Sequence, residues 1–195
     1  MNIKHYILAG LTLFALASCS EKDDTPEEFP DWKNQNEKFF EQAYLSNEYD
    51  FKLPKYSLVG ESSSNHTDYI LVRVIEEGEG EATPYLNDSV SIHYVGWLIP
   101  STTYKDGFQF DKSYLEPFDW DTAVPSSFLV NDTRIGFATA LMKMHRGDHW
   151  QIIIPYQLGY GAYEAGSSGQ IPAYSTLRFE IRLEDFWTKK KGDRD

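Results

Sequence analysis

GDHWQIIIPYQLGYGAYEAGSSGQIPAYSTLRFEIRLEDF (residues 147–186) contains two β-strand patterns separated by one long loop. The end of this stretch, residues 176–186, alternates apolar and charged residues, which is the period of a half-buried antiparallel strand. Its start, residues 150–155, is a β-branched run that a proline ends. The loop between them is rich in aromatic and apolar side chains, which disordered loops tend to lack. The pattern therefore predicts a binding loop held between two strands of a sheet.

The composition of the chain excludes some functions and favours others. The chain has 195 residues, enough for one domain with an appendage. A formal net charge of −12, without a basic stripe, argues against a nucleic-acid partner. No histidine or cysteine spacing indicates a metal site, and no cofactor is expected. Aromatic residues make up 15% of the chain, which favours a cleft lined in part by aromatic side chains.

The N-terminus resembles that of a bacterial lipoprotein. Residues 1–18 combine a basic start with an apolar run too short to span a bilayer as a helix, which predicts a signal peptide. The run ends in Leu-Ala-Ser-Cys, which resembles a lipobox and implies cleavage before Cys19 and lipidation of that cysteine. Residues 19–30 form an acidic tether, and its run Ser20-Glu21-Lys22-Asp23-Asp24 resembles the surface-export signals of Bacteroidetes lipoproteins. We therefore expect an outer membrane lipoprotein, periplasmic or surface-exposed, that meets the membrane only through its lipid anchor.

Residues 31–66 predict a helical appendage followed by a linker. Aromatic and apolar residues recur at helical spacing from Asp31, the expected N-cap, to Asn47. The pattern leaves open whether this helix packs on the main domain. Residues 48–66 are polar, contain a run of three serines and are assigned to the linker. At the other end of the chain, residues 189–195 predict a solvated tail.

Residues 67–188 predict one α+β domain. The expected elements are two strands, an irregular strand, an insertion and a short helix, at residues 69–75, 87–98, 107–113, 114–127 and 133–144. Asn131 and Asp132 are the expected N-caps of the helix. One helix among antiparallel strands predicts a sheet that packs the helix on its concave face.

The motifs of this domain resemble those of the FKBP-type peptidyl-prolyl isomerases over residues 69–186. The resemblance rests on short motifs that follow one another in the family's order, namely Glu77-Gly78-Glu79-Gly80-Glu81, Asp88-Ser89-Val90, His93-Tyr94-Val95-Gly96, Phe110-Asp111-Lys112-Ser113, Gly136-Phe137, Ile154-Pro155, Tyr160-Gly161 and Ile171-Pro172. It implies an FKBP-like antiparallel sheet wrapped around one short helix. It also implies an apolar pocket between sheet and helix that holds a prolyl residue.

The resemblance implies which side chains form this pocket. Five positions match residues that the family uses in catalysis, namely Tyr94, Phe110, Asp111, Phe137 and Tyr160. Five more match substrate-binding positions, namely Phe128, Thr133, Arg134, Ile171 and Phe179. Two departures bear on substrate choice: phenylalanine stands at position 137 where most members have tryptophan, and Thr133-Arg134 replaces an apolar pair at the pocket rim.

The resemblance implies a prolyl isomerase that acts on Xaa-Pro bonds of exported envelope proteins without covalent catalysis. An alternative is a non-catalytic module of the same fold that binds a peptide or an envelope partner, which Arg134, Phe137 and the insertion favour. A third interpretation, a surface polysaccharide binder, rests only on the aromatic residues and the anchor. The expected partners are proline-containing polypeptides, and the protein is expected to be a monomer. Macrolides of the tacrolimus type are candidate ligands whose binding the sequence does not decide.

Overall fold

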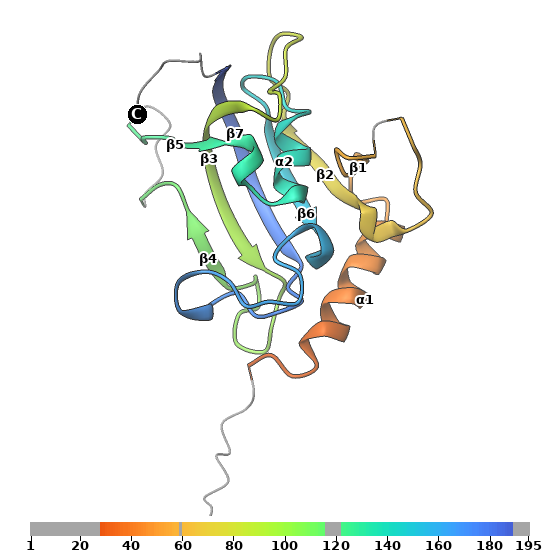
Figure 1. Ribbon diagram of the computed structural model, residues 1–195. Helices are drawn as coiled ribbons and strands as arrows, with labels where there is room; N and C mark the ends of the chain where they lie inside the picture. Colours follow the sequence, from red (N-terminus) through yellow and green to blue (C-terminus); the bar gives the residue numbers. More distant parts are fainter. Residues whose placement is uncertain (1–27, 59, 116–121, 189–195) are drawn as a thin grey trace, which may run out of the picture.

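The fold is built on a seven-stranded antiparallel sheet (Figure 1). The computed structural model describes residues 28–58, 60–115 and 122–188. The strands in chain order are β1 (Phe51–Pro54), β2 (Tyr69–Glu76), β3 (Asp88–Leu98), β4 (Gln109–Lys112), β5 (Ser126–Leu129), β6 (His149–Ile154) and β7 (Leu177–Thr188). They pair in the order β1-β2-β6-β7-β3-β4, and β5 pairs with the N-terminal part of β3.

The burial of β7 confirms the alternation predicted for it. Leu177, Phe179, Ile181 and Leu183 are buried, whereas the arginines and glutamates between them are only partly buried. Because β7 pairs with both β3 and β6, its apolar face lies at the centre of the core. The core continues on the neighbouring strands with fully buried side chains that include Ile70, Val72, Val90, Ile92, Ile152 and Ile154.

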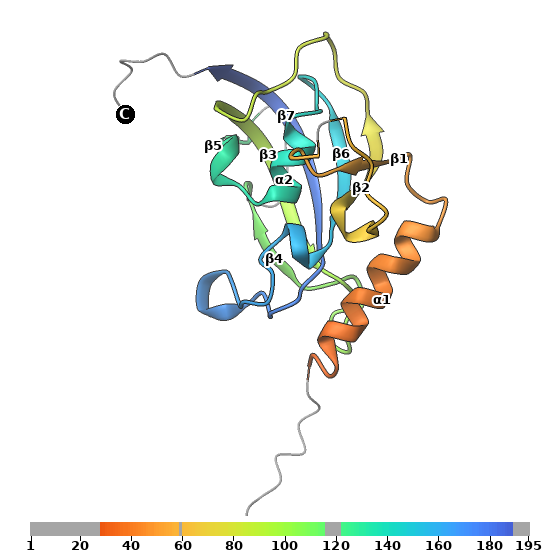
Figure 2. The ribbon, with the colours of Figure 1, turned by 45° about the vertical axis from the view of Figure 1, so that its right-hand side comes forward.

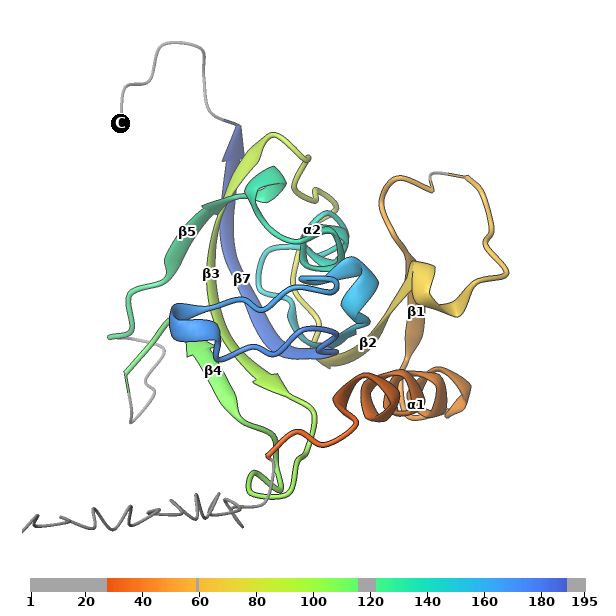
Figure 3. The same ribbon diagram turned by 60° about the horizontal axis from the view of Figure 1, so that its bottom comes forward.

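The sheet curves around the short helix α2 (Ile135–Leu141), as Figure 3 shows. Every residue of α2 after Ile135 is buried. Gly136 permits the close approach of helix and sheet, because a Cβ at this position would lie 2.4 Å from Ile154 Cγ2. The predicted architecture, an antiparallel sheet wrapped around one short helix with an N-terminal helical appendage, is thereby confirmed.

The start of α2 differs from the prediction. The helix was expected to begin at Thr133 with Asn131 or Asp132 as its N-cap. Both of these residues instead lie in a 3-10 turn, η2 (Val130–Asp132), and Arg134 occupies the N-cap position without a side-chain hydrogen bond. The Thr133 hydroxyl donates to the carbonyl at the start of this turn at 2.7 Å. A locally satisfied turn therefore replaces the first predicted turn of helix.

The N-terminal helix α1 (Trp32–Leu45) packs on the face of the sheet opposite α2 (Figures 2 and 3). Its Phe40 is buried against Leu71 and Ile153. These two side chains point away from α2 because side chains alternate between the two faces along a strand. Asp31 stands at the predicted N-cap position, but its φ of 51° is left-handed and its side chain caps no backbone N–H. Packing, rather than capping, therefore fixes this helix in place.

Part of the predicted linker is a strand. β1 lies within residues 48–66 and pairs with β2 at the edge of the sheet, so the assignment of the whole segment to a linker was wrong. The four residues of β1 include Pro54 and offer too few alternations to form a recognisable strand pattern. Its pairing with β2 supplies the hydrogen bonds that the local sequence does not predict.

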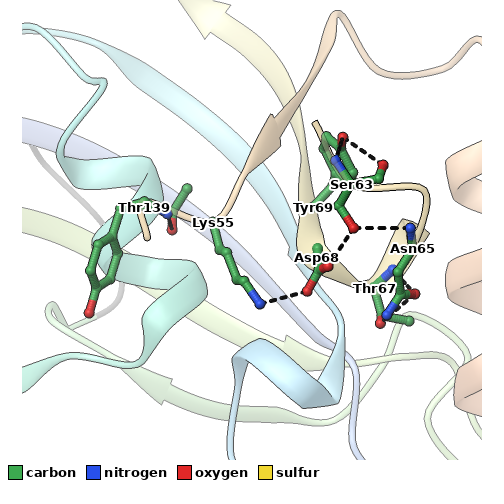
Figure 4. A network of polar contacts seen from close by, with 8 residues as sticks. Lys55, Ser63, Asn65, Thr67, Asp68, Tyr69 and Thr139 are labelled. Carbon is green, nitrogen blue, oxygen red and sulfur yellow. Dashed lines mark hydrogen bonds and ion pairs between the residues drawn. The ribbon is translucent and has the colours of Figure 1, made fainter. Parts of the chain in front are cut away.

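A polar network fixes the segment between β1 and β2 (Figure 4). The Asp68 carboxylate accepts from Lys55 Nζ at 2.7 Å and from Ser63 Oγ at 2.6 Å. The hydrogen bond from Lys55, and to a smaller extent the one from Ser63, holds the pKa of Asp68 below its usual range. The backbone N–H of Tyr56 donates to Thr139 Oγ1 at 3.1 Å, which ties the same segment to α2. The segment is therefore part of the domain.

None of the helices in the described ranges is long and apolar enough to cross a membrane. Several predicted features lie outside the described residues: the signal peptide, Cys19, most of the acidic tether, the centre of the insertion at 116–121 and the tail at 189–195. The sequence-based expectations for these segments stay predictions.

Candidate functional site

A cavity of about 410 Å³ lies between α2, the concave face of the sheet and the loop that joins β6 to β7. All ten side chains that the family resemblance assigned to a pocket line it, namely Tyr94, Phe110, Asp111, Phe128, Thr133, Arg134, Phe137, Tyr160, Ile171 and Phe179. Four further described residues line it and were not predicted, namely Asp132, Gly166, Ser167 and Gln170. These four lie in turns, where no periodic pattern marks a residue as facing a cavity.

The walls and floor of the cavity are aromatic. Phe137 projects from α2 and is 7% exposed, and its ring meets that of Phe179 from β7 at 5.0 Å with an interplanar angle of 80°. Phe110 from β4 meets Phe179 at 5.5 Å and 86°. Tyr94 from β3 makes a similar edge contact with Phe128 at 5.7 Å. Edge-to-face pairs of this kind fix ring orientations, so the apolar surface has a defined shape.

Gly96 on β3 lets two of these rings approach the sheet. It pairs directly with Phe179 across the β3–β7 ladder. A Cβ at position 96 would lie 2.6 Å from Phe179 Cε1 and 2.6 Å from Phe110 Cζ. The backbone of β3 is therefore the surface on which both rings rest, and only glycine leaves room for them.

Tyr94 and Asp111 form the polar pair of the site. The Tyr94 hydroxyl donates to Asp111 Oδ2 at 2.8 Å, and Asp111 Oδ1 accepts from the backbone N–H of Lys112 at 2.9 Å. Burial, followed by the hydrogen bond to Asp111, raises the pKa of Tyr94 well above its usual range. The phenol is therefore a neutral donor at physiological pH, and the carboxylate is oriented from two sides.

The loop over the cavity is an ordered part of the fold. Gln170 Nε2 donates to the Phe110 carbonyl at 2.7 Å, which holds the loop against β4. Ala165 and Ile171 form an antiparallel bridge with N–H···O distances of 2.9 and 3.0 Å. Two 3-10 turns lie within the loop, η3 (Tyr156–Leu158) and η4 (Ser167–Gly169). As predicted, the loop lies between two strands, β6 and β7. It covers the cavity.

Arg134 and Tyr160 meet at the rim of the cavity. The guanidinium carbon of Arg134 lies 5.2 Å from the centre of the Tyr160 ring, within the range of a cation–π contact. Arg134 is exposed and Tyr160 is partly buried. The contact connects the N-terminal end of α2 to the loop.

The chemistry available in the cavity is that of an apolar enclosure with a polar rim. Its described lining contains no histidine, cysteine or lysine. In the part of the chain that the structure describes, no cluster of three or more His, Cys, Asp or Glu side chains could hold a metal ion. The described residues of the insertion that precede Phe128, namely 114, 115 and 122–127, do not line the cavity. The cavity can therefore enclose an apolar ring and offer a few directed polar contacts.

Comparisons with known proteins agree with this geometry. A family model described as FKBP-type peptidyl-prolyl cis-trans isomerase matches residues 80–184. The macrophage infectivity potentiator of Trypanosoma cruzi is 36% identical over 118 residues, 60% of this chain and 53% of that protein. The FKBP-type 22 kDa peptidyl-prolyl cis-trans isomerase of Escherichia coli is 40% identical over 111 residues, 57% of this chain and 47% of that protein. The chain thus spans about half the length of these curated relatives.

A solved structure shares the fold. The crystal structure of a peptidyl-prolyl cis-trans isomerase from Pseudomonas syringae pv. tomato superposes with a TM-score of 0.58 at 24% identity, covering 83% of this chain and 98% of that one. At this identity the likeness bears on the fold alone.

Proposed function

Because the chain belongs to the FKBP-type peptidyl-prolyl cis-trans isomerase family, we propose that its cavity catalyses rotation about Xaa-Pro peptide bonds. The observation that carries this proposal is the cavity over Phe137, which has a volume of about 410 Å³ and is walled by aromatic rings. Pockets of about 300–1,000 Å³ are typical of small-molecule and cofactor sites. A prolyl ring is apolar and compact, and it suits a floor of this kind.

The reaction needs a site that favours a twisted amide over a planar one. Rotation about an Xaa-Pro bond is slow because it breaks amide resonance, against a barrier of roughly 18–20 kcal/mol. The planar amide is the more charge-separated form, so an apolar enclosure disfavours it relative to the twisted form. An acceleration of about 10⁵ requires about 7 kcal/mol of differential stabilisation. Shape and a few polar contacts can supply this without a nucleophile or an acid–base pair.

The proposed roles of the side chains follow from their positions. Phe137 is the floor on which the prolyl ring rests, and Phe110 and Phe179 are the walls that hold it. Asp111, oriented by Tyr94, places a fixed negative charge at the mouth, where it acts on the dipole of the rotating amide. The Tyr160 hydroxyl donates a hydrogen bond to a carbonyl of the bound peptide.

A second candidate function is a non-catalytic module that holds a proline-containing peptide or an envelope partner. Two observations favour it. Arg134 places a charge at the rim, and Phe137 forms a smaller floor than the family's usual tryptophan. Both features alter substrate fit, and neither removes the polar pair of Tyr94 and Asp111.

We further propose that the protein works at the cell envelope, where Cys19 carries the lipid anchor and the clients are exported polypeptides. The support for this is the lipobox-like sequence and the acidic tether that follows it. The soluble part of the chain would act as a monomer beside the membrane. The cavity is also a candidate site for macrolides of the tacrolimus type.

The deciding experiment measures cis-to-trans isomerisation of Xaa-Pro peptides by the full-length chain purified in detergent. Leu, Phe and Ala before proline cover the neutral substrates. The double variant Asp111→Ala, Tyr160→Phe should lose most of the catalysed rate. The matched control is Tyr163→Phe, since Tyr163 lies on the same loop but is 78% exposed. A folded wild-type protein that accelerates none of these peptides would refute the isomerase and leave the binding module.

A further inference from the structure

Arg134 is a cation at the rim of the cavity, and no described residue gives it a carboxylate partner. It lines the cavity, it is exposed, and its guanidinium carbon lies 5.2 Å from the centre of the Tyr160 ring. Within the described part of the chain, no carboxylate lies within 4.0 Å of it, whereas other arginines such as Arg146 and Arg182 are ion-paired. A cation–π contact of this kind uses the charge of the guanidinium and none of its N–H groups as a hydrogen-bond donor to an oxygen, so these groups can donate to a ligand.

The position of Arg134 is fixed by its surroundings. Its carbonyl accepts from the backbone N–H of Ala138 at 2.8 Å, which makes it the N-cap of α2. The preceding residue, Thr133, is held by the hydrogen bond from its hydroxyl to Val130. On the other side, the Tyr160 ring limits where the side chain can go. The charge therefore lies at the rim of the cavity, between helix and loop.

We propose that Arg134 is a specificity-determining residue, which selects substrates that carry a carboxylate on a residue next to the proline. This inference rests on the proposed function, because it assumes that proline occupies the floor at Phe137. With the ring there, the neighbouring residues extend over the rim. An aspartate or glutamate at one of these places can accept two parallel N–H···O bonds from the planar guanidinium.

The other charges at the rim bear on this preference. Asp111 accepts hydrogen bonds from Tyr94 and from the Lys112 backbone, so its negative charge is partly compensated. Asp132 also lines the cavity and is exposed, and it opposes the effect of Arg134. The chain as a whole carries a charge of −12, which repels acidic peptides at long range. This long-range field lowers the rate for an acidic peptide relative to its neutral analogue in every variant, so the effect of Arg134 must be measured as a change in that ratio between variants.

The test compares kcat/KM for peptides with Glu or Gln next to proline, using the full-length chain in detergent. One peptide series varies the residue before proline and the other the residue after it. We expect a Glu-to-Gln ratio of about two to five in at least one series, the range for an exposed ion pair. The ratio should fall to about one or below in Arg134→Gln and be only partly kept in Arg134→Lys, whose ammonium keeps the charge but cannot make the two parallel N–H···O bonds. It should rise in Asp132→Asn.

Two controls separate this inference from the proposed function. Lys38→Gln removes one positive charge from the exposed face of α1, and it should leave the ratio unchanged. A neutral Leu-Pro peptide reports isomerase activity independently of charge. If that peptide is turned over but Arg134→Gln keeps the wild-type ratio in both series, the inference is overturned and the isomerase stands.

If no peptide is turned over, the isomerase fails and the same peptides are measured by equilibrium binding. A Glu-to-Gln affinity ratio that depends on Arg134 would still support the inference. A ratio that is the same in wild type and Arg134→Gln would overturn it.

Discussion

A single methyl group added at Gly96 should deform the cavity wall. In Gly96→Ala, the new Cβ would lie 2.6 Å from an atom of the Phe110 ring and 2.6 Å from one of the Phe179 ring. Ordinary van der Waals contact begins near 3.4 Å, so each ring must retreat by about 0.8 Å. Neither ring can move freely, because the two are in edge contact with each other and Phe179 is also in edge contact with Phe137. The displacement therefore passes into the floor and walls of the cavity.

Gly96→Ala should lower both the stability of the fold and the rate of catalysis. Overpacking a well-packed site destabilises a protein by about 1–3 kcal/mol, and two rings rather than one are displaced here, which puts the cost at about 2 kcal/mol or more. In a domain of this size, 2 kcal/mol lowers Tm by about 4–8 °C. The effect on kcat/KM should be larger, since misplacing binding groups by about 1 Å can reduce a rate about 100-fold. We therefore expect kcat/KM to fall by about 10- to 100-fold.

The assay pairs thermal unfolding with peptide isomerisation at a temperature where the variants stay folded. Gly78→Ala is the matched control, because its Cβ would lie 2.3 Å from the Arg146 carbonyl oxygen, away from the cavity. That variant should lose stability but keep its rate per folded molecule. If Gly96→Ala kept both wild-type Tm and wild-type kcat/KM, the reasoning about the rings would be refuted. Equal losses of activity in the two variants would show that general destabilisation, and not wall shape, is responsible.

Three further predictions concern the rest of the chain. Asn36→Ala should cost about 1–3 kcal/mol in thermal unfolding, because it leaves the buried backbone N–H of Thr176 without its 2.7 Å acceptor; an unchanged Tm would contradict this. The pKa of Tyr94 is raised in the folded state, so the unfolded chain loses this proton first and the free energy of unfolding should fall as pH rises above about 10. In Tyr94→Phe the free energy of unfolding should fall less over this pH range, as urea titrations at pH 8 and above pH 10 would measure. An equal fall in wild type and variant would refute this prediction. Cys19→Ala should move the protein from the membrane fraction to the soluble fraction, and its retention in membranes would argue against the lipid anchor.

The sequence predicted best where periodicity and motif coincide. The alternation from Leu177 to Glu184 has one structural solution, a strand with one buried face, and β7 has that form. The cavity residues were identified by motif resemblance, since nothing in the local pattern of Phe110 or Ile171 distinguishes a pocket wall from ordinary core. The structure brings all ten of them to one cavity because β3, β4, β5, β7, α2 and the β6–β7 loop converge there. Their roles in catalysis depend on the experiments above.

The sequence predicted least where long-range pairing overrides local signals. β1 is a strand only because β2 offers it an edge, and its own four residues carry no clear pattern. Asn131 and Asp132 are good N-caps by residue type, but η2 uses this segment for a tighter turn. The four unpredicted cavity residues lie in η2 and the β6–β7 loop, where side-chain direction depends on turn geometry. That geometry is set by tertiary contacts such as the hydrogen bond from Gln170 to Phe110.

The sequence left the position of α1 open, because an amphipathic pattern does not specify which surface the helix packs against. The structure ties this helix to both ends of the loop over the cavity. Asn36 accepts from the Thr176 backbone at the end of the loop, and Glu37 accepts from the Tyr156 hydroxyl at its start, at 3.0 Å. Residues outside the span of family resemblance therefore anchor the loop that carries Tyr160. A chain lacking α1 would keep the ten cavity residues but lose two of the contacts that hold this loop, so we expect α1 to support the site.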